Sequence, residues 1–447
     1  MTISLTALAL CAALVPQHEE ELLATVPAEL ALEGKPEVSP DGLTTVPNVV
    51  RIEWSADGSA VGYVGLRGAR PVPVIGDELF DASYAWAVGP EFSADGKHWV
   101  FRVGKMAGKD RERWSVLLDG KEVGAEDWIG GVSIAPAGDG WCAWTQPGAR
   151  YDSTGAYARG DQVLVTPWKK GAKWSDAYSL VPPRFSPDGS FVTTLASKAG
   201  EWRIVIADKK GERELGKPHA WISGWDVSAD GKSLALLLPD PKGRAPGGLP
   251  PGMPPDMLPG GGKSVVVFGK ETFGAERDGA GHVTLSPDGK HVAWSFRAKE
   301  RSGVAVDAGK DAKPSHESVV AIAWRPDGKE LAYVGCDGAT AKPGLMTAAG
   351  ARVLEGGTWS VVRRAANGKE TPEPTTRSEI AHLTWSKDGK LLAYAAKDAE
   401  GWRIVCGAKQ SAAFDQVGPP RIALDGKSVG FGARQDRELH WKALQLE

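Results

Sequence analysis

Apolar and polar residues alternate in short segments along most of the chain, which is the period-two pattern of β-strands with one buried face. The segments HVAWSF (291–296) and ELAYVG (330–335) show this alternation clearly. Each follows a turn-like sequence in which an apolar or aromatic residue and usually Ser precede Asp-Gly. The combined pattern recurs nine times, in WSADGSAVGYV (54–64), FSADGKHWVFRV (92–103), IAPAGDGWCAW (134–144), FSPDGSFVTTLA (185–196), VSADGKSLALLL (227–238), LSPDGKHVAWSF (285–296), WRPDGKELAYVG (324–335), WSKDGKLLAYAA (385–396) and IALDGKSVGFG (422–432).

The repeated motif has the properties of a tight β-hairpin. Pro presets φ near −65°, Asp accepts hydrogen bonds from nearby backbone N–H groups, and Gly supplies the positive φ that closes the turn. The Asp-Gly pairs begin at residues 57, 95, 139, 188, 230, 288, 327, 388 and 425. We therefore expect these pairs to be turn residues and not calcium ligands.

A third strand-like segment follows each hairpin. The clear examples are WSVLLDG (114–120), WRIVIAD (202–208), SVVVFGK (264–270), VAVDAG (304–309), WSVVRRA (359–365) and WRIVCGA (402–408), and the weaker ones are VPVIGD (72–77), QVLVTP (162–167) and LHWKALQL (439–446). A fourth, more variable stretch then leads to the next hairpin. Four strands in about 40–45 residues is the spacing of a β-propeller blade.

We therefore predict an all-β protein with a single closed β-propeller of four-stranded blades. Nine repeats predict nine blades; eight is the alternative if the degenerate copy near Asp139 or the last copy fails to form a full sheet. The last copy ends after its third strand, and residues 28–46 are the candidates for its missing fourth strand, which would cover an open edge. The predicted propeller spans residues 22–447, with a Pro- and Gly-rich loop inserted at 239–262.

The hairpin SPDGK (286–290), together with strands such as WSVLLDGK (114–121), resembles the WD40-like repeats of TolB-type periplasmic propellers. The resemblance covers about residues 50–447. It implies the propeller architecture and no particular activity, because this repeat serves adaptors, peptidase lids and other envelope proteins. Residues 22–49 are too few for the separate N-terminal α/β domain of TolB, so a role in that system is not implied.

The composition agrees with a globular protein that is not basic overall. Of 447 residues, 42% are hydrophobic and 24% charged, and the net charge of −3 gives no bias toward nucleic acid. Four cysteines in this length exclude a disulfide scaffold. We expect Cys142, Cys336 and Cys406 to be buried as small hydrophobic residues, and we expect a monomer.

The only long apolar run is ISLTALALCAALVP (3–16), which is shorter than the roughly 20 residues that span a bilayer. We therefore expect no transmembrane span. The run is followed by polar residues and has the length of a secretory signal sequence, although no Lys or Arg precedes it and no clean A-x-A site follows. A short N-terminal helix is the alternative. We favour a signal peptide within residues 1–21 and an extracytoplasmic location.

Sequence motifs for catalysis and metal binding are missing. There is no G-x-S-x-G, no H-E-x-x-H and no C-x-x-C. His219, His282, His316 and His382 each precede a hairpin, where a His in the WD40-like repeat bonds within its own blade. We therefore predict no metal site and no cofactor.

One position per repeat falls on the predicted innermost strand, just before the hairpin aromatic. It is occupied by Glu53, Glu91, Ser133, Arg184, Asp226, Thr284, Ala323, Thr384 and Ile422. We predict that Glu53, Glu91, Arg184 and Asp226 line the central channel. They form either a solvated lining, with Arg184 paired to a neighbouring acid, or a polar pocket for acid–base chemistry.

Three long insertions, 146–161, 239–262 and 337–358, fall between a second and a third strand, and such connections all emerge on one face. The insertion 239–262 holds 8 Pro and 7 Gly in 24 residues together with apolar Met and Leu. The eight internal connections of this kind carry 18 basic and 12 acidic residues. We predict that this face binds a partner through residues including Arg111, Arg113, Tyr151, Tyr157, Met253, Met257, Arg297 and Arg301.

Two functions from different classes follow from these features. The first is a non-catalytic scaffold that binds a protein or peptide, with a bias toward an acidic one. The second is an enzyme that acts on a small molecule or carbohydrate in the central channel. The missing motifs favour the scaffold.

Overall fold

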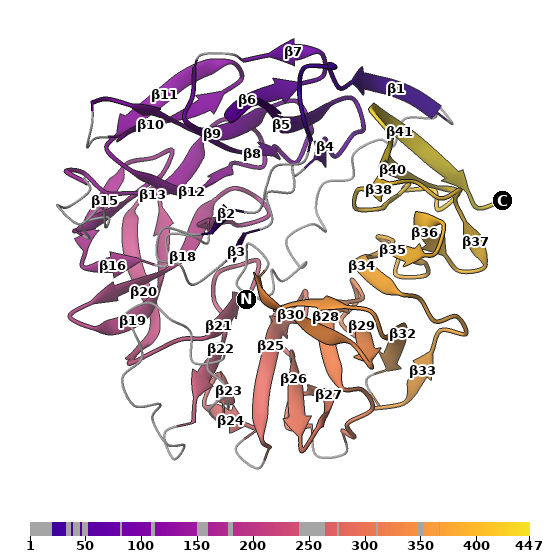
Figure 1. The fold of residues 1–447 in the computed structure, drawn as a ribbon. Coiled ribbons are helices and arrows are strands. Elements are labelled where there is room, and N and C mark those ends of the chain that lie inside the picture. The colour runs from indigo at the N-terminus through magenta and orange to yellow at the C-terminus, as the bar shows by residue number, and fades with distance from the viewer. Residues whose placement is uncertain are drawn as a thin grey trace.

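The computed structural model describes residues 20–32, 37–38, 45–46, 52–80, 83–108, 112–149, 160–177, 182–240, 264–274, 277–309, 312–346, 352–365 and 367–447. These residues form β-strands and turns, and no helix occurs among them. Nine antiparallel sheets follow one another around a ring (Figure 1). The nine-bladed propeller is confirmed, and the eight-bladed alternative is wrong.

Within the first eight blades the strands run in chain order from the channel outwards, and in the ninth the outermost strand comes from the N-terminus. The innermost strands are β4 (Glu53–Trp54), β8 (Trp86–Phe92), β12 (Ile129–Ile134), β16 and β17 (Asp176–Ala177, Arg184–Phe185), β21 (Gly224–Val227), β25 (Gly279–Leu285), β28 (Ser318–Trp324), β34 (Glu379–Trp385), and β38 and β39 (Gln416–Val417, Arg421–Ile422). The second strands are β5 (Val61–Arg67), β9 (Trp99–Met106), β13 (Trp141–Thr145), β18 (Phe191–Lys198), β22 (Leu234–Pro239), β26 (Val292–Ala298), β29 (Glu330–Asp337), β35 (Leu392–Asp398) and β40 (Ser428–Gln435).

The outer half of each blade contains the predicted third strands and a more variable fourth. The third strands are β6 (Arg70–Ile75), β10 (Glu112–Leu118), β14 (Gln162–Val165), β19 (Glu201–Asp208), β23 (Ser264–Phe268), β27 (Arg301–Val306), β32 (Thr358–Ala365), β36 (Gly401–Cys406) and β41 (Glu438–Gln445). The fourth strands are β7 (Glu78–Leu79), β11 (Lys121–Glu126), β15 (Lys170–Trp174), β20 (Gly211–His219), β24 (Glu271–Phe273), β33 (Glu370–Pro372), β37 (Lys409–Gln410) and β1 (Glu20–Thr25). Over the described residues, the sixth sheet has three strands, β25, β26 and β27.

The N-terminal strand β1 closes the ring by pairing with the last strand, β41. The prediction that residues 28–46 supply this strand is wrong, because the segment that pairs is Glu20–Thr25. It begins two residues before Leu22, the start that the sequence suggested for the propeller. Closure by the N-terminus means that the ninth blade is held by residues from both ends of the chain.

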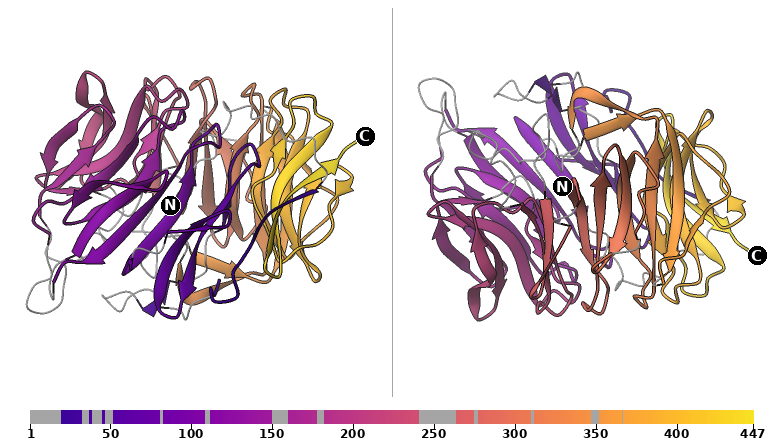
Figure 2. Two further views of the ribbon diagram at one scale, coloured as in Figure 1. Left: turned by 90° about the horizontal axis from the view of Figure 1, so that it is seen from above. Right: turned by 90° about the horizontal axis from the view of Figure 1, so that it is seen from below.

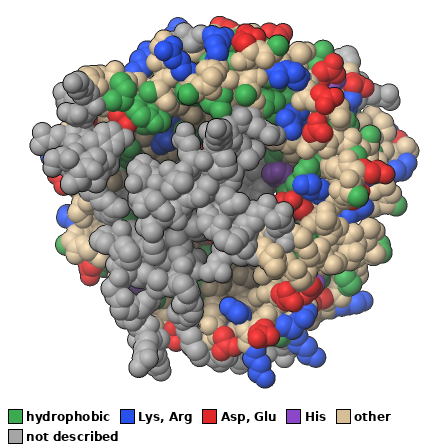
Figure 3. All heavy atoms as spheres, viewed as in Figure 1, with side chains coloured by type: hydrophobic (Ala, Val, Ile, Leu, Met, Phe, Trp, Pro, Cys, Tyr) green, Lys and Arg blue, Asp and Glu red, His purple; other side chains and the backbone are tan. Residues whose placement is uncertain are grey.

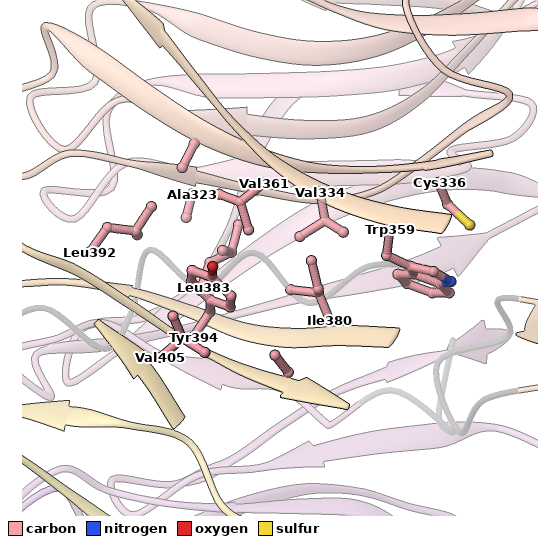
Figure 4. Close-up of a cluster of buried hydrophobic side chains, with 12 residues drawn as sticks. Ala323, Val334, Cys336, Trp359, Val361, Ile380, Leu383, Leu392, Tyr394 and Val405 are labelled. Carbon is pink, nitrogen blue, oxygen red and sulfur yellow. The ribbon is translucent and has the colours of Figure 1, made fainter. Parts of the chain in front are cut away.

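The hydrophobic core lies between neighbouring blades, because each sheet buries both of its faces against the next. Figure 4 shows one such layer, in which Val334, Cys336 and Val361 of the seventh blade face Ile380 and Tyr394 of the eighth. The hairpin tryptophans follow the same rule: Trp385 Nε1 donates to the carbonyl oxygen of Ala323 in the preceding blade at 3.1 Å. Cys142, Cys336 and Cys406 are free and buried, as predicted.

Antiparallel blades give the ring two different ends. Connections between first and second strands, and between third and fourth, lie at one end, which we call the turn face. Connections between second and third strands, and from each blade to the next, lie at the other end, which we call the insertion face. The insertions 146–161, 239–262 and 337–358 separate β13 from β14, β22 from β23 and β29 from β32, so their predicted positions are confirmed.

A small additional sheet lies on the insertion face. It contains β2 (Glu37–Val38), β3 (Thr45–Val46) and the hairpin β30 (Thr340–Met346) and β31 (Arg352–Glu355), with β3 parallel to β30. Both side views of Figure 2 place it at one end of the ring. The link from β1 to β4 and the insertion in the seventh blade open onto the same face, which is why segments 300 residues apart can pair.

Candidate functional site

The turn face is a ring of nine similar hairpins whose polar side chains are bonded within the turn. In the sixth blade, Ser286 Oγ donates to Asp288 Oδ1 at 2.6 Å and accepts from the His291 N–H at 3.0 Å. The hydrogen bond from Ser286 lowers the pKa of Asp288. Five other blades repeat this pair, as Ser55–Asp57, Ser93–Asp95, Ser186–Asp188, Ser228–Asp230 and Ser386–Asp388. The Asp side chain therefore stabilises the turn that the sequence predicts.

Three blades depart from this motif: the third, the seventh, and the ninth, in which Ala423 replaces the Ser. In the seventh blade Arg325 replaces Ser, and its hydrogen bonds to Asp327 lower the pKa of that carboxyl to about 2. In the degenerate third copy the turn glycine is Gly138, with φ +73°, and its N–H donates to the carbonyl of Ala135. The assignment of the Asp139 pair to the turn is therefore wrong by two residues.

The insertion face contains a second repeated hydrogen bond that sequence analysis missed. In four blades a carboxylate before the first strand accepts the backbone N–H of a residue 21 positions later, in the turn between the second and third strands. The pairs are Asp127 with Gly148, Asp278 with Lys299, Glu317 with Gly338, and Asp415 with Asp436. All four residues that donate the N–H have positive φ. A search for an acid 21 residues before each such turn would have found them.

The described basic residues predicted for the binding face do lie there, and each contacts a neighbouring turn. Arg113 pairs with Asp127 (Nη1 to Oδ1, 3.3 Å), and its side chain is 49% exposed. Arg301 pairs with Asp337 (Nη2 to Oδ1, 3.3 Å) and is 51% exposed, while Arg297 Nε donates to the carbonyl of Lys299. They are separated along the ring, Arg113 in the second blade and the other two in the sixth. Arg111, Tyr151, Tyr157, Met253 and Met257 lie outside the described residues.

Basic and acidic side chains are intermixed along the top, right and lower edges of the view in Figure 3. The same face also holds Lys105, whose ammonium lies 4.9 Å from the ring centre of Tyr84 and 2.6 Å from Glu122. Next to it, Met106 is 47% exposed, although it ends a strand. The second blade therefore presents an apolar side chain beside basic groups at this end.

Two of the four predicted channel residues, Arg184 and Asp226, lie in neighbouring blades and each contacts the next blade. Burial lowers the pKa of Arg184 on β17, and the nearby charge of Asp226 on β21 opposes that shift. The Arg184 guanidinium lies 4.6 Å from the ring centre of Trp225. Asp226 in turn accepts the Leu285 N–H at 2.8 Å and the Thr284 hydroxyl at 3.2 Å. These contacts join the fourth blade to the fifth and the fifth blade to the sixth.

The other two, Glu53 and Glu91, are half-buried on the neighbouring innermost strands β4 and β8. Burial raises the pKa of Cys142 in the third blade, and the charge of Glu91 adds to that shift. In the ninth blade the residue equivalent to Glu53 is Arg421, because Ile422 takes the place of the hairpin aromatic Trp54. The assignment of Ile422 to this position is therefore wrong.

The innermost strands are irregular at similar levels, which the sequence pattern did not indicate. β8, β12, β25, β28 and β34 each contain a register shift, and the inner position is split in two in the fourth and ninth blades. At these irregularities Val88 is 52% exposed, and His382 is exposed with φ +57°. Bulges of this kind change the direction of a side chain and occur beside binding sites.

The histidines before the hairpins do not behave alike. His316 Nδ1 lies 2.7 Å from Asp337 Oδ2 within the seventh blade, which confirms the predicted role there. His282 of the sixth blade instead donates from Nε2 to the carbonyl of Val319 in the seventh at 2.9 Å, so the prediction of a bond within its own blade is wrong. Burial lowers the pKa of His282 to about 4.

Among the described residues, no group of three or more His, Cys, Asp or Glu side chains could hold a metal ion. In the same part of the chain no helix has the length and apolar character needed to cross a membrane.

No family model and no curated protein matches this chain. Solved structures do resemble it. A eukaryotic initiation factor is 11% identical with a TM-score of 0.48, and the match covers 86% of this chain and 89% of that one. The Dos1 propeller is 9% identical with a TM-score of 0.43, over 80% of this chain and 92% of that one. Prolyl oligopeptidase B from Galerina marginata is 12% identical with a TM-score of 0.38, over 78% and 55%. These similarities concern the fold alone.

Proposed function

We propose that this protein is a non-catalytic β-propeller scaffold that binds a protein or peptide partner through its insertion face. We also propose that its repeats are of the WD40-like, TolB type and that it acts outside the cytoplasm, the last on the basis of the apolar run at residues 3–16. The observation that supports binding is that all three long insertions open onto one face. Propeller loops vary freely in length, but random variation would distribute insertions over both faces.

The contrast between the two faces supports the same proposal. Turns on the turn face are short and bonded internally, as in the Ser286–Asp288 hairpin. The insertion face combines long connections with half-exposed Arg113 and Arg301 and exposed Met106. Arg and Met are enriched where proteins bind one another. The surplus of 18 basic over 12 acidic residues in its connections favours an acidic partner.

The channel has less support as an enzyme site. The Asp226 carboxylate accepts the Leu285 N–H and the Thr284 hydroxyl, and the half-buried Arg184 guanidinium lies over the ring of Trp225. A carboxylate that is bonded to the next blade is poorly placed to exchange protons with a substrate.

The first test removes the Pro- and Gly-rich insertion. The wild-type chain and a variant lacking residues 243–261 would be immobilised and used to capture proteins from an envelope fraction, with bound proteins quantified by mass spectrometry. We expect the variant to keep the wild-type melting temperature and to lose at least tenfold of the specific partner. Undiminished capture would assign this insertion a spacer role.

The second test separates the two faces by charge. Reversing Arg113, Arg297 and Arg301 to Glu should weaken capture of an acidic partner and reduce its dependence on salt. The matched control reverses Lys232, Lys290 and Lys390 on the turn face, whose side chains are 82%, 76% and 82% exposed. Equal loss in both triple variants would contradict binding through the insertion face.

A further inference from the structure

The fourth blade ends in an outer strand that is more regular than the others. β20 pairs with β19 over five consecutive residues, from Asp208↔Gly211 to Ile204↔Leu215. The other fourth strands pair over at most three consecutive described residues, because they are short or contain a register shift. Within the described part of the chain, no backbone hydrogen bond reaches β20 from its outer side. We call the outer side of Gly211–Leu215 the β20 edge.

Two residues of the β20 edge present their backbone groups outwards. In an antiparallel pair, residues that exchange hydrogen bonds with the neighbouring strand alternate with residues whose N–H and C=O point away from it. The turn between β19 and β20 has two residues, so Asp208 and Gly211, which close it, are a hydrogen-bonded pair. Glu212 and Glu214 therefore point their N–H and C=O away from β19. A register shift at Gly216, where φ is +82°, ends the regular edge.

Basic side chains without ion pairs surround this edge. Lys169 belongs to the neighbouring turn of the third blade, and its Nζ donates to the carbonyl oxygen of Lys210 at 3.2 Å. Lys209 lies in the same turn as Lys210, and Arg213 lies on β20 itself. All four side chains are exposed. Over the described residues, none of the four takes part in an ion pair.

The acidic residues of the same hairpin are bonded within the fold. Asp208 Oδ1 accepts the Lys210 N–H at 2.7 Å inside the turn. Glu212 Oε2 accepts two N–H groups of β15 in the third blade, at 3.2 and 3.3 Å. Glu214 pairs with Arg203 (Oε2 to Nε, 3.1 Å). Positive charge at a sheet edge repels a second copy of the same edge, whereas it attracts a strand of opposite charge.

We propose that the β20 edge binds an extended acidic peptide by strand addition. The peptide backbone pairs with the outward N–H and C=O groups of Glu212 and Glu214, as peptides do at other open sheet edges. Its carboxylates are bound by the basic groups of Lys169, Lys209 and Arg213. Because β20 begins at the turn face, this site is separate from the insertion face, and the inference goes beyond the function proposed above.

The first experiment tests strand addition with a defined probe. The labelled peptide Glu-Val-Glu-Val-Glu-Val-Glu is titrated with the full chain, and binding is followed by fluorescence anisotropy. Binding should weaken as salt is added, and the counterpart with Lys in place of Glu should not bind. The same acidic peptide N-methylated at every residue should bind at least tenfold more weakly, because it has lost the N–H groups that pair with the edge. Equal binding of the methylated peptide would overturn strand addition.

The second experiment tests the location of the site. One variant combines Lys169→Glu, Lys209→Glu and Lys210→Glu and should bind the acidic peptide at least tenfold more weakly than the wild type. The matched control reverses three exposed lysines in or next to the equivalent turns of the fifth, seventh and eighth blades, Lys270, Lys369 and Lys409. Both variants should keep the wild-type melting temperature. Equal weakening in both, or no binding of the acidic peptide to the wild type up to about 1 mM, would overturn the proposal.

Charge reversal on the insertion face distinguishes this site from the proposed function. The variant in which Arg113, Arg297 and Arg301 are changed to Glu should bind the acidic peptide as the wild type does. Partner capture by the insertion face is measured separately, so either proposal can fail without the other.

Discussion

Replacing the turn glycine Gly289 by Ala should destabilise the protein more than its backbone conformation alone requires. Gly289 has φ +67°, in the left-handed region, where an L-residue costs roughly 1–2 kcal/mol. A Cβ at this position would lie 2.9 Å from the Cβ of Ser228 and 3.2 Å from the Oγ of Ser233, both in the neighbouring fifth blade. The packing of the two blades therefore adds a second cost.

Ser228 cannot move away easily. Its hydroxyl donates to Asp230 Oδ1 at 2.6 Å and accepts the Ser233 N–H at 2.9 Å. Overpacking of a well-ordered site typically costs about 1–3 kcal/mol. We therefore expect Gly289→Ala to lower the free energy of unfolding by about 2–5 kcal/mol.

The chain offers a matched control in the fifth blade. Gly269 has φ +60°, but no atom lies within 4 Å of a Cβ built on it. Gly269→Ala should therefore lower the free energy of unfolding only by the backbone cost of about 1–2 kcal/mol. Urea unfolding of the wild type and both variants, followed by tryptophan fluorescence, measures the difference. Equal losses in the two variants would refute the packing argument, and no loss in either would refute the turn conformation.

Three further predictions follow from contacts between distant segments. The pKa of His282 falls from 6.5 to about 4 on folding, so the stability that its neutral form provides is complete above pH 6.5 and decreases as the pH falls toward 4, by up to about 3 kcal/mol. In His282→Gln the urea midpoint should therefore depend less on pH between pH 7 and pH 5 than in the wild type. The same pH dependence in both proteins would contradict this. Arg437→Ala should lower the free energy of unfolding by about 2–4 kcal/mol, because three charge-assisted hydrogen bonds to the carbonyl oxygens of Val26, Pro27 and Leu30 are lost, and should expose the N-terminal segment to limited proteolysis. Protection from proteolysis equal to that of the wild type would refute the anchoring of this segment by Arg437. Excising residues 339–356 joins Gly338 to Gly357, whose φ values of +71° and +77° suit a two-residue hairpin turn. The circular dichroism spectrum and the melting temperature of this variant should change little. An unfolded variant would show that the excised hairpin of β30 and β31 supports the seventh blade.

The repeat could be predicted from the sequence because it depends on interactions between neighbouring residues. The period-two alternation, the Asp-Gly turns and the spacing of about 40 residues are all short-range properties, and they predicted nine blades and the position of every third strand. The long insertions were placed correctly for the same reason, since each interrupts a recognisable strand pair such as β29 and β32.

Contacts between blades could not be predicted in this way. Whether His282 bonds to its own blade or to Val319 of the next depends on a bulge in each of two strands, β25 and β28, and neither bulge has a sequence signature. The contact of Arg184 with Trp225, and the hydrogen bonds from the sixth blade to Asp226, likewise depend on how closely neighbouring sheets approach.

The sequence by itself determined the repeating unit, because turn conformation and strand alternation are set by neighbouring residues. Only the tertiary structure decided which segment closes the ring. Residues 28–46 and 20–25 both lie near the N-terminus, and the shorter, earlier segment pairs with β41, where Glu20 contacts Lys442 and Ala24 packs in the buried cluster that contains Trp441. The turn glycines show the same division: a positive φ is required by the turn alone, whereas the absence of space for a Cβ at Gly289 exists only once the fifth blade is packed against it.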